Sequence, residues 1–255
     1  MVKRSRLIEA IEEDFKQRHP GFHKSRREGL TTLAGVMLEV RSANLMELAA
    51  ALPRAIGAAG HRYQYIERQL KNEEIDADAA IKPYALQAIE LLASRGQTIV
   101  LQMDQSHIND TNEVLMVSVR LRKRAVPVAW RVRSTQGNIG FAVQKELLDG
   151  VLAWLPEEVS VMLAADRFYG TAQLIGWCQK AGWSYRIRLK GNLTLAHDGG
   201  ELTTGDVAAR LPRGVTRAEL YGSGVSTNIG VLHEKGHKEP WIIAMDAHPS
   251  QYTVL

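Results

Sequence analysis

The chain has 255 residues, of which 45% are hydrophobic and 24% are charged, as in a soluble globular protein with one large domain or two smaller ones. These proportions exclude a disordered chain and a fibrous repeat. The single cysteine, Cys178, cannot form an internal disulfide and suits a reducing compartment. No apolar run approaches the ~18 residues of a membrane helix, and acidic residues follow the basic N-terminus where a signal peptide would be apolar. We therefore expect a cytoplasmic protein.

The formal net charge is +4 and the isoelectric point is near 9.2, which is compatible with a nucleic-acid partner. The segment from Val114 to Lys145 contains no acidic residue and concentrates basic ones. These are Arg120, Arg122, Lys123, Arg124, Arg131, Arg133 and Lys145. They form either a solvated basic hairpin or a face that contacts phosphates, and the sequence leaves both interpretations open.

Apolar periodicity predicts helices over the first ~95 residues. The predicted helices are 7–18, 30–40, 45–52, 62–70 and one running from Pro83 to Ser94. Asn44 is expected to cap the third helix, Pro83 to lie in the first turn of the last one, and Gly96 to end it. This helical region, 1–96, is interpreted either as a scaffold or as a DNA-binding head.

After Gly96 the pattern predicts an α/β domain in which helices cover a mixed sheet. Strands are expected at 98–103, 114–121, 125–133, 159–165 and 185–189, and helices at 141–154 and 171–181. The run 159–165 is continuously apolar, which is typical of a strand buried on both faces. From Gly191 to the C-terminus, short strands at 214–220, 228–233 and 241–245 between glycine-rich turns predict a β-rich insertion.

Two aspartates follow apolar strands: Asp104 after 99–103 and Asp166 after 161–165. Each alone could simply open a turn or cap a helix. If the two strands are neighbours, the carboxylates face each other at one edge of the sheet, and like charges there are tolerated when a divalent cation lies between them. Oxygen ligands without histidine or cysteine favour Mg²⁺ or Mn²⁺ over zinc.

The sequence around these aspartates resembles the first two acidic motifs of DDE transposases from bacterial insertion sequences. The matching residues are Leu101-Gln102-Met103-Asp104-Gln105-Ser106 and Ala164-Ala165-Asp166-Arg167-Phe168-Tyr169-Gly170. Residues 185–192 and the β-rich segment are also similar to that family, most closely to its IS-four members, whose catalytic domain has a ribonuclease-H-like fold. The resemblance covers about 98–255. It implies that Asp104 and Asp166 are two of three metal-binding catalytic carboxylates.

The third carboxylate of the family pattern is missing. That pattern places a glutamate four residues after an arginine that itself follows a tyrosine by three. Asn192 occupies the glutamate position after Tyr185 and Arg188, and neither Tyr221 nor Tyr252 begins a match. The chain is therefore expected to end before the third-acid helix, and its remaining acidic alternatives are Glu234, Glu239 and Asp246.

A different motif, His233-Glu234-Lys235-Gly236-His237, matches the spacing of zinc peptidases. That chemistry needs both histidines on one face of a helix, whereas Gly236 and Pro240 favour a hairpin turning at Lys235-Gly236. Cys178 is interpreted as a packing residue, and the glycines at 222 and 224 lack the lysine of a phosphate-binding loop.

By resemblance, the chain is expected to catalyse DNA transposition, with strand cleavage and joining by phosphoryl transfer on two Mg²⁺ or Mn²⁺ ions. The implied partners are double-stranded DNA, as terminal repeats and target, and a second copy in a synaptic homodimer; the implied location is the bacterial nucleoid. Arg167, Arg188 and Lys190 join the basic hairpin as candidate phosphate ligands. The alternatives are a truncated, inactive DNA-binding relic and, more remotely, the zinc peptidase.

Overall fold

The computed structural model describes residues 5–53, 58–197, 200–211, 214–233, 235–236 and 239–246. The chain divides into two compact units between Pro83 and Tyr84. The division falls inside a helix, rather than at Gly96 where the change of sequence pattern places the boundary.

The first unit is helical, as predicted. It contains α1 (Arg6–Arg18), α2 (Lys24–Val40), α3 (Leu45–Ala51) and α4 (Ala59–Leu70). Asn44 caps α3 as expected, because its side chain accepts hydrogen bonds from the backbone N–H groups of Met46 and Glu47. Gly35 lets α1 approach α2 closely, since a Cβ there would lie 2.5 Å from Ile8 Cγ1. The core of this unit consists of Ile8, Leu33, Val36, Leu48, Ala49, Leu52, Tyr65 and Ile66.

Helix α5 (Ala77–Ala93) begins before the predicted start at Pro83, so the placement of that proline in the first turn is wrong. The Asp76 carboxylate accepts a hydrogen bond from Ala79 N at 3.1 Å and supplies the cap that opens the helix. Gly96, with φ of +63°, lies beyond the C-terminal end as expected. Ala85 and Ile89 in the later part of α5 belong to the core of the second unit.

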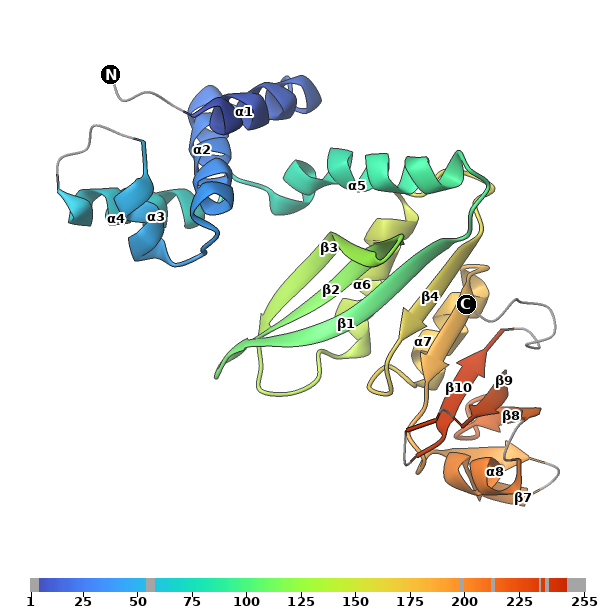
Figure 1. The fold of residues 1–255 in the computed structure, drawn as a ribbon. Helices are drawn as coiled ribbons and strands as arrows, with labels where there is room; N and C mark the ends of the chain where they lie inside the picture. Colours follow the sequence, from blue (N-terminus) through green and yellow to red (C-terminus); the bar gives the residue numbers. More distant parts are fainter. Residues whose placement is uncertain are drawn as a thin grey trace. The chain divides into compact units, whose positions relative to one another are not determined.

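The second unit is built on a mixed, ten-stranded sheet in the order β3-β2-β1-β4-β5-β10-β9-β8-β6-β7. Its core strands are β1 (Ile99–Asn109), β2 (Asn112–Leu121), β3 (Arg124–Ser134), β4 (Val161–Ala165) and β5 (Ser184–Arg188). β1, β4 and β5 are parallel neighbours, while β2 and β3 continue the sheet as antiparallel strands. The expected fold class is confirmed: a ribonuclease-H-like mixed sheet with flanking helices, preceded by an all-α region (Figure 1).

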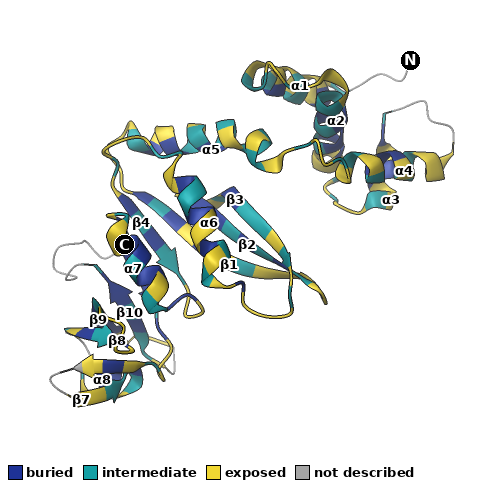
Figure 2. Cartoon of the chain, turned by 180° about the vertical axis from the view of Figure 1, so that it is seen from behind, coloured by how far each residue is buried: buried dark blue, intermediate teal, exposed yellow. Residues whose placement is uncertain are grey.

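Helices α6 (Phe141–Leu152) and α7 (Ala172–Lys180) cover one face of this sheet (Figure 2). Alternate residues of β1 show the asymmetry: Leu101 and Met103 are buried, whereas Gln102 and Asp104 on the other face are exposed. β4 follows the same rule, since Ala164 is only half-buried. The expectation that this strand is buried on both faces is therefore wrong.

The β-rich C-terminal part contains β6 (Thr194–His197), β7 (Gly200–Thr203), β8 (Gly214–Leu220), β9 (Val225–Leu232) and β10 (Trp241–Met245). It extends the core sheet, because β10 pairs with both β5 and β9. A short helix, α8 (Thr204–Arg210), was not predicted; Thr203 and Asp206 form a reciprocal capping box at its start. Of the helices that the structure describes, none is long and apolar enough to cross a membrane.

Candidate active site at one edge of the sheet

Asp104 and Asp166 occupy equivalent positions at the point where the pairing of the parallel strands β1 and β4 ends. The register of β1 and β4 ends with Met103 opposite Ala165, so the next residue on each strand is one of the two aspartates. Asp104 does not end its strand as expected, because β1 continues to Asn109 paired with β2. What ends at Asp104 is the pairing with β4, and this leaves both carboxylates exposed at the edge where β4 stops.

Backbone groups hold one oxygen of each carboxylate. Gln105 N donates to Asp104 Oδ1 at 2.9 Å, and Phe168 N donates to Asp166 Oδ1 at 2.8 Å in an Asx turn. A carboxylate can accept about four hydrogen bonds or metal contacts, so Oδ2 of each aspartate remains available for another ligand.

The loop that carries Asp166 packs tightly against the end of β5. Ala165 is opposite Ile187, so Arg188 is the next residue beside Asp166. Gly170 makes the packing possible, since a Cβ there would lie 2.9 Å from the Arg188 carbonyl oxygen. The aspartate and the arginine are therefore fixed relative to each other by backbone contact.

Tyr169 belongs to the same loop, and only 1% of it is exposed. Burial raises the pKa of its phenol, and the negative charges of Asp104 and Asp166 raise it further. The hydroxyl is therefore within electrostatic reach of both carboxylates and stays protonated, as a hydrogen-bond donor.

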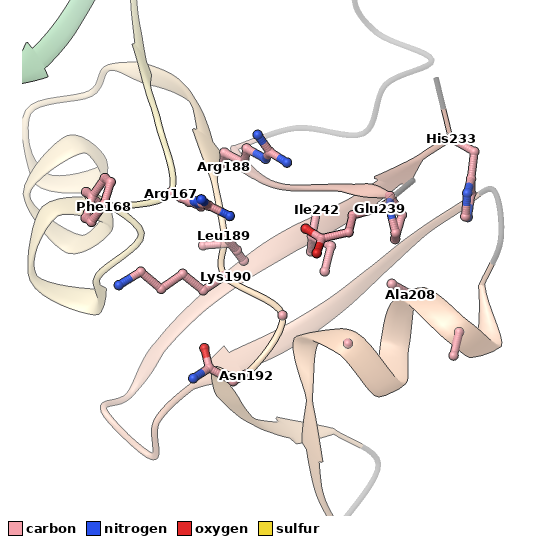
Figure 3. A pocket seen from close by; sticks show the side chains of 14 residues that line it. Arg167, Phe168, Arg188, Leu189, Lys190, Asn192, Ala208, His233, Glu239 and Ile242 are labelled. Atoms are coloured by element: carbon pink, nitrogen blue, oxygen red, sulfur yellow. The ribbon is translucent and has the colours of Figure 1, made fainter. Parts of the chain in front are cut away.

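A pocket of about 830 Å³ lies between the loop after β4, the end of β5, α8 and the β9–β10 connection (Figure 3). Arg167, the residue after Asp166, lines it, whereas neither aspartate does. Three candidate phosphate ligands, Arg167, Arg188 and Lys190, line it together. Lys190 Nζ lies 5.0 Å from the centre of the Phe168 ring, and the Arg188 guanidinium carbon lies 4.8 Å from that of Trp241. The remaining lining residues are Leu189, Gly191, Asn192, Gly205, Ala208, Ala209, His233, Glu239, Pro240 and Ile242. The pocket thus presents several positive charges next to aromatic rings.

The basic turn between β2 and β3 is remote from this edge. It comprises Arg120, Arg122, Lys123 and Arg124. Met116 is opposite Asp104, so Arg122 lies six positions further along an antiparallel strand, about 20 Å away. The four residues are exposed and do not join the aspartates.

Arg131 and Arg133 of β3 contact α6. Both pair with Glu146, at 2.8 Å and 3.5 Å. The hydrogen bond from Arg131 is the largest cause of a lowered pKa for the Glu146 carboxyl. Their charge is therefore partly compensated within the protein. Lys145, the last residue of the basic segment, pairs with Asp149 in the same helix.

Of the acidic alternatives that the structure describes, neither Asp246 nor Glu239 completes a set of carboxylates with the two aspartates. Asp246 contacts Arg186 at 2.7 Å and Ser184, which is level with Met162 at the far end of β4. Glu239 lines the pocket, and Glu234 lies outside the described residues. Within the part of the chain that the structure describes, no three histidine, cysteine or acidic side chains form a group that could hold a metal.

The described residues of the His-Glu motif, His233, Lys235 and Gly236, do not lie in a helix. His233 directly follows β9, and the antiparallel pairing of Leu232 with Trp241 makes the segment a hairpin, as predicted. Gly236 has φ of +95°, which suits the turn. Glu234 and His237 lie outside the described residues.

Cys178 is fully buried in α7, and burial raises the pKa of its thiol to about 12. Its interpretation as a packing residue agrees with both observations.

Sequence reasoning singled out both aspartates and the three cations of the pocket, but it gave no role to Phe168 and Tyr169 and named Glu239 only as an acidic alternative, without placing it in the pocket. The first two were legible as neighbours of Asp166 in the chain. Glu239 reaches the pocket only because β10 pairs with β5, a tertiary pairing that no local pattern encodes.

No family model matches the chain, and no curated protein matches it in sequence. Two solved structures of endonuclease V from Ciona intestinalis are distantly similar. One, in complex with a 24-mer DNA containing an inosine followed by a ribo-adenosine, is 12% identical with a TM-score of 0.36, over 65% of this chain and 82% of that chain. The other, a single-residue variant of that enzyme with a 23-mer DNA, is 12% identical with a TM-score of 0.34, over 68% of this chain and 84% of that chain. A likeness this distant transfers neither fold nor function to the chain.

Proposed function

We propose that this chain is a DNA-processing enzyme that transfers phosphoryl groups with a divalent cation, of the DDE transposase type. The observation that carries the proposal is the position of Asp104 and Asp166 directly after the last paired residues of the neighbouring parallel strands β1 and β4. Two carboxylates at this spacing repel each other unless a cation lies between them. The resemblance of the segments around both aspartates to transposase motifs supports the finer assignment.

The residues present fit one hard cation. Carboxylate oxygens are the ligands that Mg²⁺ and Mn²⁺ prefer, and Mg²⁺ needs only one or two of them because it keeps several waters. A bound cation would polarise a phosphodiester and make a water more nucleophilic. A second ion, expected from the resemblance, needs a further carboxylate, and the described residues bring none to Asp104 and Asp166.

The side chains around the aspartates have separate tasks in this proposal. Asp104 and Asp166 hold the cation through the oxygens that the backbone leaves available. Arg167 and Lys190 bind phosphates of the DNA backbone, and the exposed ring of Phe168 offers a surface on which a base can stack. Arg188, beside Asp166, keeps the phosphate close to the carboxylates.

A second candidate is a protein that binds DNA without cutting it. The observation in its favour is the lack of a third carboxylate near the pair among the described residues. Misplacing reacting groups by about 1 Å can cost on the order of 10²-fold in rate, so two ligands alone position the chemistry poorly.

The first test is metal binding, measured by titration calorimetry and Mn²⁺ electron paramagnetic resonance. Mn²⁺ should bind the wild-type protein, and Asp104→Asn or Asp166→Asn should each weaken binding. Stability without metal should hold or rise in both variants, because removing one charge relieves repulsion on its neighbour. Unchanged Mn²⁺ affinity in both variants would refute the assignment.

The second test is DNA binding as a function of salt. Arg167→Ala/Lys190→Ala should reduce the slope of log affinity against log salt by roughly one to two, since each lost phosphate contact releases about one counterion less. Arg122→Ala/Lys123→Ala removes the same charge from the opposite end of the sheet and is the matched control. If the control variant reduces the salt slope more than Arg167→Ala/Lys190→Ala does, DNA binds at the basic turn instead.

The third test separates the two candidates by Mn²⁺-dependent nicking of a supercoiled plasmid. Slow nicking that Asp104→Asn abolishes supports the enzyme. DNA binding without any nicking, even at high Mn²⁺ concentration, supports the binding protein.

A further inference from the structure

Two tyrosines of the second unit, Tyr169 and Tyr185, are equally buried, each 1% exposed, but their hydroxyl groups differ. The Tyr185 hydroxyl is bonded to Thr227 Oγ1 at 2.9 Å and to Gln179 Nε2 at 3.1 Å. The Tyr169 hydroxyl has no hydrogen-bond partner among the residues that the structure describes. A buried polar group without a partner is rare in folded proteins and calls for an explanation.

The surroundings of Tyr169 indicate what the hydroxyl serves. Tyr169 N donates to the Asp166 carbonyl oxygen at 3.2 Å, so the backbone of Tyr169 belongs to the turn that begins at Asp166. The next residue, Gly170, lies against the Arg188 carbonyl and holds this turn on β5. The negative charges of Asp104 and Asp166 both raise the pKa of the phenol, so the hydroxyl is near enough to the pair to respond to both charges.

We infer that Tyr169 is a positioning residue whose hydroxyl donates a hydrogen bond to the carboxylate pair Asp104–Asp166 when the pair holds a cation. This inference rests on the proposed function and adds a residue to it. Backbone N–H groups bind Oδ1 of each aspartate, so the donor from Tyr169 orients a carboxylate from a second direction. Donors of this kind fix the geometry of ligating carboxylates, and their loss commonly weakens metal binding about tenfold to a hundredfold.

Packing alone is the competing explanation. In that case the ring only fills space and the hydroxyl contributes nothing. The two explanations predict different effects of removing the hydroxyl on metal binding. If the Tyr169 hydroxyl forms its hydrogen bond only when a cation is bound, it has no partner in the metal-free protein. Removing the hydroxyl should then leave the stability of the metal-free protein unchanged and weaken metal binding.

The experiment compares Tyr169→Phe with Tyr185→Phe in the full chain. Each substitution removes one buried hydroxyl and keeps the ring. Metal-free stability is measured by urea unfolding, and Mn²⁺ affinity by paramagnetic resonance. Tyr169→Phe should unfold at the wild-type urea concentration or higher and bind Mn²⁺ about tenfold more weakly. Tyr185→Phe should unfold at a lower urea concentration, because it removes the two buried hydrogen bonds that the Tyr185 hydroxyl makes to Thr227 and Gln179, and should bind Mn²⁺ like the wild type.

The outcomes also separate this inference from the proposed function. If Asp104→Asn and Asp166→Asn weaken Mn²⁺ binding but Tyr169→Phe retains wild-type affinity, the inference is wrong and the proposed function stands. A loss of metal-free stability in Tyr169→Phe as large as that in Tyr185→Phe also overturns the inference. If the aspartate variants and the wild type bind Mn²⁺ equally, the proposed function fails and the inference fails with it.

Discussion

The contact between Gly170 and β5 makes a prediction that depends only on packing. A Cβ at position 170 would lie 2.8 Å from Leu189 Cδ2 and 2.9 Å from the Arg188 carbonyl oxygen. Comfortable contacts between carbon atoms need about 3.5–4.0 Å, so Gly170→Ala overlaps both neighbours. Leu189 is buried and cannot turn away freely, and the backbone there is fixed by the hydrogen bond from Leu189 N to Ile242 O at 2.7 Å.

The expected cost follows from this lack of room. Inserting a methyl group into a packed region costs roughly 1–3 kcal/mol, and a backbone neighbour that cannot yield places Gly170→Ala at about 2–3 kcal/mol. For a unit of this size the melting temperature should fall by roughly 4–12 °C. Because the overlap pushes the Asp166 turn away from Arg188, Mn²⁺ affinity should fall as well.

Gly150→Ala is the matched control. Gly150 lies in α6, and a Cβ there meets nothing within 4 Å. Alanine favours a helix by roughly 0.5–1 kcal/mol over glycine, so the same substitution should stabilise the protein and leave metal binding unchanged. Calorimetric melting of the three proteins, with and without Mn²⁺, measures both effects. A Gly170→Ala variant as stable as the wild type would show that the loop is not packed on β5 in this way.

Three further predictions concern single side chains. Burial by itself raises the pKa of Asp246, but hydrogen bonds from its arginine and serine partners outweigh it and lower the pKa overall. The carboxylate therefore stabilises the fold above its unfolded-state pKa near 4, and this contribution is lost as the pH falls through the lower folded-state value. Asp246→Asn should reduce the free energy of unfolding at pH 7 by about 1.5–3 kcal/mol and flatten its decline in acid, as urea titrations at several pH values would show. Glu146→Gln should change stability by less than about 1 kcal/mol in urea unfolding, because the Glu146 side chain is about half exposed and solvent screens its ion pairs with Arg131 and Arg133. The Cys178 thiol should resist alkylation at pH 8 in the folded protein and react within minutes in urea, and mass spectrometry would detect rapid native labelling if the burial were absent.

Much of the fold could be predicted because local patterns agree with it. The changes from helical to strand periodicity, the Asn44 cap and the Gly96 stop all have local causes, and strands β8 and β10 lie at the predicted positions. The failures also have physical reasons. The apolar run of β1 ends at Met103, yet the strand continues to Asn109 because β2 supplies backbone partners to its polar half. The α8 helix was missed, although the capping box from Thr203 to Asp206 is legible in the sequence.

Pro83 illustrates the limit of a local rule. A proline inside a helix removes one hydrogen bond and costs about 3 kcal/mol, which favours its placement in the first turn. In the structure α5 runs through it from Ala77 to Ala93, and the two compact units divide directly after it. The later turns of the helix are held by burial of Ile89 and Leu92 in the sheet unit, so tertiary packing outweighs the local preference.

Part of the candidate site could be predicted from local sequence, and part of it depends on tertiary structure. Asp104 and Asp166 were found from the sequence because both end apolar runs, and parallel pairing then brings them into register. The pocket could not be found, because its lining comes from four separate segments that meet only through the order β4-β5-β10-β9. Local sequence patterns identify candidate ligands, whereas the order of the strands in the sheet determines which of these ligands lie at the same end of neighbouring strands.

In the proposed function, the acidic pair and the basic pocket act on the same DNA. Two carboxylates alone repel a phosphodiester, and three cations alone bind it without chemistry. In that proposal, one divalent cation on Asp104 and Asp166 neutralises the two negative charges of the pair, so that DNA held by Arg167 and Lys190 would no longer be repelled by the carboxylates. DNA affinity should then rise with Mn²⁺ in the wild type. Asp104→Asn should bind DNA more tightly than the wild type without metal and gain less from Mn²⁺, and a wild-type affinity that Mn²⁺ leaves unchanged would mean that the pair and the pocket act on different ligands.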